Sequence, residues 1–154
     1  MKIDICEIFK PHRKQVEFLT STARHRFFMA GRGAGKSWCL TLDVLLRALA
    51  NEGLACALLG RTERDLTRNL LPFLSDHLAK LKEATGIDYV QRYSRGDQLL
   101  TLRNGSTIHW RGYQRVSKLR GANLAHCHLD EVCWSETDEL TVWETIAATV
   151  RLPC

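Results

Sequence analysis

The sequence predicts an α/β fold in one domain over residues 1–154, with a mostly parallel sheet, flanking helices and an inserted β-hairpin. Short apolar runs bounded by glycine alternate with segments whose leucines recur every three or four residues, as strands alternate with helices in such folds. A glycine-rich turn also joins the first apolar run directly to the first long helical segment. The length of 154 residues suffices for one domain with a buried core.

The first half of the chain contains four predicted elements. A short helix over 12–22 precedes a compact apolar strand at 26–30, and the glycine-rich turn leads into a helix from 36 to about 51. A second buried strand is expected at 54–60. Leucines at helical spacing then predict a helix over 66–81, which Pro72 breaks or kinks because proline cannot continue the helical hydrogen bonding.

The second half adds a hairpin, a third buried strand and a last helix. Residues 98–112 contain two strand-like runs around Asn104-Gly105, a pair that favours a type I′ turn. The strand at 124–132 ends in acidic residues. A final helix then runs to Val150, and Ser135 and Asp138 are candidates to cap its start.

Composition and charge narrow the class of protein. The hydrophobic content of 45% and charged content of 25% are ordinary for a globular protein. No apolar run approaches the roughly 18 residues of a membrane span, and the N-terminus lacks a secretory signal, so a cytoplasmic protein without membrane contact is expected. The net charge of +5 favours an anionic partner, either a nucleotide or a nucleic acid.

The six cysteines contain no C-x-x-C pair, and four of them lie in apolar runs. We therefore interpret them as free thiols, mostly buried, rather than as disulfides or a zinc site. The only metal-like grouping is "HCHLDEVC". Strand alternation would place His126 and His128 on one face and Cys127 on the other, so these side chains would not converge on one ion.

The segment "FFMAGRGAGKSWCL" at 27–40 is one residue short of a phosphate-binding loop. In the template G-x-x-x-x-G-K-[ST], the first glycine position falls on Ala30. A β conformation suffices at that position, and the next glycine can supply the unusual backbone torsion. A glycine turn that merely precedes Lys-Ser is the alternative. The strand before and the helix after favour a P-loop, formed by Gly31, Arg32, Gly33, Ala34, Gly35, Lys36 and Ser37.

Each residue type in this loop suits phosphate chemistry. Backbone N–H groups at a helix N-terminus curl around phosphate oxygens, and glycines permit the close approach. Lys36 would reach the β- and γ-phosphates of ATP, and the Ser37 hydroxyl would bind Mg²⁺. The dinucleotide fingerprint G-x-G-x-x-G is excluded, because its last glycine position falls on Lys36 when counted from Gly31.

An acidic pair at the end of the third strand completes the predicted site. Asp130 would share the metal with Ser37, and Glu131 would activate the attacking water as a general base. The alternative is that the two carboxylates only cap the following loop. With a P-loop upstream, the pair favours hydrolysis of ATP.

These residues together resemble the N-terminal ATPase domain of the large subunit of phage DNA-packaging terminases. The resemblance covers nearly the whole chain and is carried by "FKPHRKQVEFL", "GRGAGKS" and "LRGANLAHCHLDE", in that order. It implies a P-loop NTPase fold of the ASCE type. An arginine inside the loop is typical of this family, which also tolerates the missing first glycine.

The resemblance also suggests roles for residues outside the loop core. Gln15 corresponds to a glutamine that recognises adenine, although a solvated helix position is the alternative. Arg120 corresponds to an arginine that reaches the ATP of a neighbouring subunit, with Arg32 as its rival in cis and a plain surface arginine as the other interpretation. Arg61 is a weaker candidate for sensing phosphate or DNA.

The family implies a ring of subunits that translocates double-stranded DNA into a capsid, together with a small subunit and a portal. A candidate DNA tract is "HWRGYQRVSKLRG", although a solvated hairpin edge is the favoured interpretation; its relevant residues are Trp110, Arg111, Tyr113, Arg115 and Lys118.

The chain ends before the coupling strand and the nuclease domain of this family, so we expect a C-terminally incomplete ATPase domain without nuclease activity. The absent strand predicts a gap in the sheet or an apolar slot beside residues 26–30. Two other functions stay open: a helicase-like P-loop translocase, and a fragment that binds nucleotide or DNA without hydrolysis.

Overall fold

The computed structural model describes residues 4–119, 123–132 and 139–150 of the chain. Its strands are β1 Ala55–Gly60, β2 Val90–Ser94, β3 Leu99–Leu102, β4 Thr107–Gly112 and β5 Leu124–Leu129. They form one sheet in the order β2-β3-β4-β1-β5. Strand β1 pairs in parallel with β4 and β5, whereas β3 pairs antiparallel with β2 and β4. The predicted α/β fold is confirmed, with a mixed sheet rather than a mostly parallel one.

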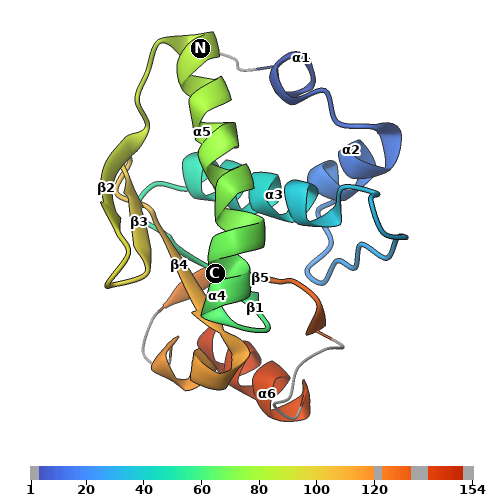
Figure 1. Cartoon of the computed structure of the whole chain (residues 1–154), viewed down its shortest axis with the longest axis vertical. Coiled ribbons are helices and arrows are strands. Elements are labelled where there is room, and N and C mark those ends of the chain that lie inside the picture. Colours follow the sequence, from blue (N-terminus) through green and yellow to red (C-terminus); the bar gives the residue numbers. More distant parts are fainter. Residues whose placement is uncertain (1–3, 120–122, 133–138, 151–154) are drawn as a thin grey trace.

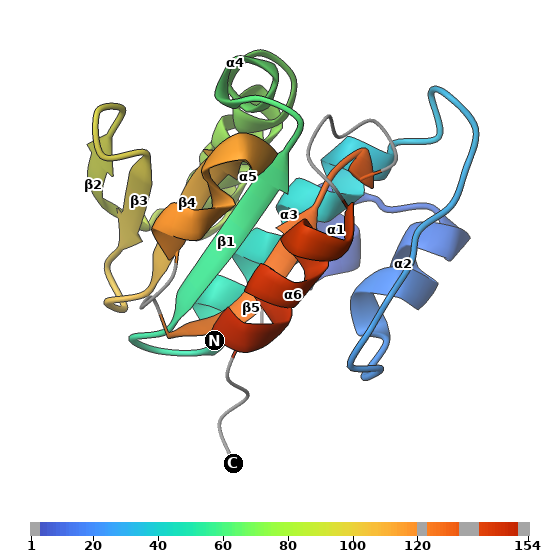
Figure 2. The ribbon, with the colours of Figure 1, turned by 90° about the horizontal axis from the view of Figure 1, so that it is seen from below.

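Helices cover both faces of this sheet (Figures 1 and 2). The α-helices are α1 Ile5–Phe9, α2 Arg13–Thr20, α3 Lys36–Ala50, α4 Glu63–Asp65, α5 Leu71–Thr85 and α6 Glu139–Thr149. A π-helical turn, Leu66–Leu70, joins α4 to α5, and a 3-10 segment, Tyr113–Leu119, follows β4. None of the helices in the described ranges is long and apolar enough to cross a membrane.

The alternation of side chains along β1 divides the core in two. Cys56 and Leu58 pack on the face covered by α3 and α5, whereas Ala57 and Leu59 pack on the face covered by α6 and the 3-10 segment. All four side chains are fully buried. A strand buried on both faces is read from sequence as a continuous apolar run, which is how this strand was predicted.

The predicted strand at 26–30 is wrong. These residues form no strand and pair with none of the described strands, and β5 lies at the edge of the sheet. Phe27 and Met29 are 77% and 90% exposed. An extended segment becomes a strand only when a neighbour satisfies its N–H and C=O groups, and none of the described strands lies beside this one. Across the same edge of β5, Val150 forms a single parallel bridge with Leu124.

The hairpin between β3 and β4 is confirmed, but its turn differs from the prediction. A type I′ turn needs positive φ at both central residues. Here Gly105 has φ of 80°, whereas Asn104 does not have positive φ. The Asn104 side chain instead donates to the carbonyl oxygens of Ala48 and Leu49 at the end of α3. The hairpin is also less of an insertion than expected, because β4 is a central strand beside β1.

The remaining differences concern short elements. Helix α1 and strand β2 were not predicted, since five residues carry too little periodic signal. The helix is irregular before Pro72 but is not broken there: α4, the π-helical turn and α5 follow one another without a gap, and Pro72 lies in the first turn of α5. The predicted capping residues Ser135 and Asp138 lie outside the described residues.

Candidate functional site

The glycine loop connects the extended segment at 26–30 to the N-terminus of α3. Gly33 and Gly35 have φ of 81° and 72°, a left-handed conformation that favours glycine. Gly35 is the N-cap residue of α3, and a β-carbon there would lie 2.6 Å from the amide nitrogen of Gln15. At Gly31 and Gly33 a β-carbon would meet no atom within 4 Å. The turn is therefore open on the side of Gly31 and Gly33 and closely supported at Gly35.

Lys36 begins α3, and its side chain folds back over the loop. Its ammonium donates to the carbonyl oxygens of Ala30 at 2.8 Å and Gly31 at 2.9 Å. The unpaired N–H groups at a helix start carry partial positive charge, and a lysine beside them adds a full one. The loop and the helix start therefore carry positive charge, which suits an anion.

The acidic pair follows β5 directly. The Asp130 backbone N–H donates to the Leu59 carbonyl at 2.9 Å, and its carbonyl accepts from the Tyr113 hydroxyl at 2.6 Å. Parallel pairing of β1 and β5 thus extends to this residue. Glu131, by contrast, has φ of 52°, a left-handed conformation that is strained for a non-glycine residue, and its side chain is exposed.

The fold brings the loop and the acids together. The Ser37 hydroxyl lies 3.5 Å and 3.4 Å from the two carboxylate oxygens of Asp130, although 93 residues separate them in sequence. Burial, then the Glu131 charge, raises the pKa of Asp130 above its ordinary value, and Ser37 and Lys36 oppose this shift. Hydroxyl and carboxylate oxygens at this spacing form a hard-oxygen donor set of the kind that Mg²⁺ prefers.

The other predicted site residues differ in their surroundings. Gln15 is 5% exposed: its amide oxygen accepts from the His12 N–H, and its amide nitrogen donates to the Gly35 carbonyl at 3.3 Å. Its side chain thus supports the loop. Arg32 is exposed within the loop, and the ion pair that the described residues offer Arg61 is a long one, 3.8 Å to Asp65. Arg120 lies outside the described residues.

The candidate DNA tract is mostly engaged inside the molecule. Trp110 and Tyr113 are buried, so neither can stack on a base. Arg111 donates to backbone carbonyls of the β2–β3 hairpin, and Arg115 pairs with Glu63 at 3.2 Å. The aromatic residues of this segment thus belong to the core, whereas Arg115 and Lys118 are exposed, and contact with DNA stays a prediction.

The cysteines and histidines of β5 are placed as alternation predicts. The His128 side chain contacts α3, whereas Cys127 packs in the core on the opposite face. Among the described residues no group of three metal-binding side chains converges. Cys39 and Cys56 are buried free thiols, while Cys6 is exposed. Burial raises the pKa of both buried thiols to about 12, which keeps them protonated.

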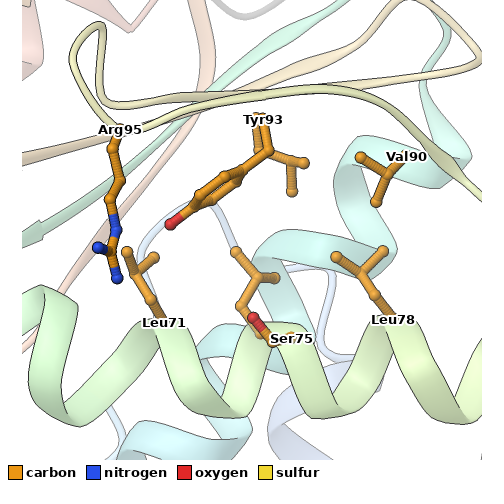
Figure 3. Close-up of a pocket in the computed structure, with 8 residues that line it drawn as sticks. Leu71, Ser75, Leu78, Val90, Tyr93 and Arg95 are labelled. Atoms are coloured by element: carbon orange, nitrogen blue, oxygen red, sulfur yellow. The ribbon is translucent and has the colours of Figure 1, made fainter.

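A cavity of about 420 Å³ lies between α5 and the β2–β3 hairpin. Figure 3 shows Tyr93 and Arg95 above the helix, facing Leu71, Ser75 and Leu78. Leucines dominate the lining, which is completed by Leu74, Val90 and Leu100. No residue of the glycine loop or the acidic pair contributes to this cavity, so it is separate from the candidate site.

One buried polar cluster escaped the sequence prediction. Asp43, in the middle of α3, is 1% exposed and contacts Arg26, Arg47 and His128. The sequence feature that could have revealed this cluster is Asp43 itself, an acidic residue among the leucines of α3. Sequence alone does not reveal its partners, because two of them come from other elements.

Comparisons with known proteins agree with this architecture. Residues 27–149 match the model of a protein family described as the N-terminal part of terminase large subunits of the T4likevirus type. A search of curated proteins returned no match.

Solved structures show the same fold at low sequence identity. The ATPase domain of the large terminase of Thermus phage P74-26 superposes with a TM-score of 0.67 at 20% identity, covering 96% of this chain and 66% of that one. A point mutant of the same domain gives 0.72 at 20% identity, with 94% and 64% covered. The large terminase of a thermophilic bacteriophage gives 0.66 at 18% identity, with 89% and 36% covered. The chain therefore spans less than two thirds of the ATPase-domain structures that it resembles.

Proposed function

The chain belongs to the family of T4likevirus-type terminase large subunits, whose N-terminal part it matches over 27–149, and on that premise we propose that it is the Mg²⁺-dependent ATPase of a DNA-packaging motor. The observation that carries this proposal is the meeting of Ser37 and Asp130 beside the glycine loop. A loop that only turned the chain would have no need of a carboxylate at that point.

The glycine loop binds the triphosphate in this proposal. The backbone N–H groups of 31–36 surround the phosphate oxygens, for which the open space at Gly31 and Gly33 leaves room. The Lys36 ammonium exchanges the carbonyl oxygens that it now contacts for β- and γ-phosphate oxygens. Gln15, hydrogen-bonded to the Gly35 carbonyl, supports the loop, and recognition of adenine by its amide would require exchange of its present contacts.

Ser37 and Asp130 hold Mg²⁺, which would neutralise charge on the β- and γ-phosphates. The raised pKa of Asp130 fits this role, because a buried carboxylate beside Glu131 gains most from a nearby cation. Glu131 accepts a proton from the attacking water. Arg120, or Arg32 within the same chain, stabilises the charge that develops on the γ-phosphate.

Motor activity and partners follow from the family. The domain would act in a homo-oligomeric ring in the bacterial cytoplasm, where it couples ATP hydrolysis to translocation of double-stranded DNA through a portal. A terminase small subunit would take part. The net charge of +5 is compatible with contacts to DNA phosphates.

The test combines nucleotide binding with turnover. We expect Lys36→Ala to lower the affinity for an ATP analogue in the presence of Mg²⁺ at least about 100-fold. The variant loses a charge-assisted hydrogen bond to each of two phosphates, and such bonds contribute strongly to the free energy of binding. Glu131→Gln should keep the affinity and lose turnover by about 10²–10⁴-fold. Titration calorimetry measures the first result, and phosphate release with and without duplex DNA measures the second.

Lys80→Ala is the matched control. This lysine is half-exposed on α5, and its ion pair among the described residues is with Asp76 on the same helix. It should leave both measurements unchanged. Equal ATP affinity in wild type and Lys36→Ala would refute the site, and stimulation by single-stranded but not duplex DNA would favour a helicase-like translocase.

A further inference from the structure

The Asp43 carboxylate joins three parts of the molecule that converge on the candidate site. It lies on α3, six residues after Ser37, and its side chain is 2% exposed. His128 on β5 donates from Nε2 to Oδ2 at 2.6 Å. Arg26, which precedes the glycine loop, donates from Nη1 to Oδ1 at 3.0 Å. Arg47, on the same helix, approaches both oxygens at 3.2 Å.

The partners of Asp43 reach further into the chain. Arg26 also donates to the Phe18 carbonyl at 3.0 Å and lies over the Phe18 ring at 4.7 Å, at the end of α2. Burial opposes the charge on Asp43, but the hydrogen bonds from His128 and Arg26 outweigh it and hold the pKa of the carboxyl below its ordinary value. The carboxylate is therefore ionised, and the positive charge of its arginine partners compensates its negative charge. Its hydrogen bonds fix the direction from which His128 and Arg26 approach it.

The location of this cluster relative to the metal-binding pair suggests its purpose. Along α3, Asp43 is about 9 Å from Ser37, and along β5, His128 is about 7 Å from Asp130. The hydrogen bond between Asp43 and His128 fixes the position of α3 relative to β5. It therefore also sets the distance between Ser37, at the start of α3, and Asp130, at the end of β5. Between α3 and the β5 segment, the described side-chain hydrogen bonds are this buried one of 2.6 Å and the long Ser37–Asp130 contact of 3.4 Å.

A buried ion pair is a costly way to add stability, since desolvation offsets most of its attraction. An apolar pair would hold α3 against β5 equally well but would let them slide, because apolar contacts have little directionality. We propose that Asp43, through His128 and Arg26, is a positioning residue that holds the Ser37 hydroxyl and the Asp130 carboxylate at Mg²⁺-binding distance. This inference rests on the proposed function and adds a role that the loop and the acidic pair do not reveal.

The test uses His128, because its removal leaves Asp43 paired with both arginines and its charge compensated. We expect His128→Leu to weaken Mg²⁺ binding to the complex with a non-hydrolysable ATP analogue by about 10–100-fold, as loss of supporting contacts does at metal sites. Affinity for the analogue without Mg²⁺ should change less than about threefold, because the loop is intact. His128→Gln, which restores an N–H donor, should recover most of the loss. Calorimetric titration with Mg²⁺ provides the readout.

Arg47→Met is the matched control: it removes a partner of the same carboxylate whose described hydrogen bonds go to Asp43 and the Ser21 carbonyl and not to β5, and it should leave Mg²⁺ affinity unchanged. If His128→Leu does not fold, Asp43→Glu keeps the charge, displaces the carboxylate by one methylene, and should weaken Mg²⁺ binding in the same selective way. Unchanged Mg²⁺ affinity in folded His128→Leu, or an equal loss in Arg47→Met, would overturn the positioning role alone. A wild-type chain that binds no ATP analogue would overturn the proposed function instead.

Discussion

Glu131 and Asp130 are neighbours with opposite environments. Asp130 is half-buried, continues the pairing of β5 with β1, and has a raised pKa. Glu131 turns away in a left-handed conformation with φ of 52° and an exposed side chain. Strained torsions of this kind persist where the surrounding structure or the function requires them. The turn separates two adjacent carboxylates, as their different proposed roles demand.

The strain at Glu131 yields a prediction at the scale of a single residue. Glu131→Gly should raise the free energy of unfolding by up to about 1 kcal/mol, because glycine adopts left-handed torsions without a steric cost. The same change should abolish ATP turnover, because the proposed base is gone. Urea denaturation and phosphate release measure the two effects. A loss of stability would show that the Glu131 side chain makes stabilising contacts that outweigh its backbone strain.

At the scale of elements, α3 and α5 are joined by a buried histidine. His77 on α5 is fully buried and hydrogen-bonds through Nε2 to the Trp38 carbonyl at 3.1 Å and the Thr41 hydroxyl at 3.2 Å. Phe9 and Trp38 lie edge-on to its ring. Its Nδ1 is buried without a hydrogen-bond partner among the described residues. The neutral ring therefore fits this site, and burial lowers the pKa of His77.

This arrangement predicts how stability depends on pH. Above about pH 6.5 the histidine is neutral in both states and its contribution is complete. As pH falls below that value, the unfolded chain takes up a proton that the folded chain resists, so stability declines towards the lowered folded pKa. His77→Gln, which retains a donor to Trp38, should reduce this slope by at most about 1.4 kcal/mol per pH unit.

Urea denaturation between pH 8 and pH 5 measures the effect, and the values at pH 8 are the internal reference. Some slope should remain in the variant, since burial also lowers the pKa of His126, to about 4. Identical slopes in wild type and His77→Gln would contradict the buried neutral histidine.

The elements themselves were predictable where periodicity was long. Helix α3 and strand β1 match their predicted ranges closely, because fifteen residues of helical spacing or a run of buried residues carry a strong signal. The turn at Asn104-Gly105 was misjudged because Asn104 caps the end of α3 from a distance, a contact with no local signature. The cluster around Asp43 was invisible for the same reason.

For the whole molecule, the main feature is the contrast between the buried apolar residues of the central strands and the exposed apolar residues of the segment before the glycine loop. Leu58 lies at the centre, fully buried between β4 and β5, while Phe27 and Met29 extend outside the sheet. Large apolar side chains with this much exposure are informative, because apolar surface favours association.

These positions give a prediction about global stability. Leu58→Ala should lower the free energy of unfolding by about 2–5 kcal/mol, because it leaves a cavity in a packed core. The double change Phe27→Ser and Met29→Ser should alter it by less than about 0.5 kcal/mol, as expected for exposed residues. Thermal and urea denaturation of both variants provide the comparison. A large loss in the double variant would mean that these side chains are covered in solution.

The sequence by itself determined the α/β class, the glycine loop with Lys36 and Ser37 at a helix start, and the acids at the end of a buried strand. These features depend on local periodicity and on the spacing of a few residues, which a chain displays directly. Only the tertiary structure decided that residues 26–30 stay outside the sheet, that Ser37 meets Asp130, and that Asp43 ties α3 to β5. Such outcomes depend on which distant segments become neighbours, and that is settled by hydrogen-bond partners and burial, not by local pattern.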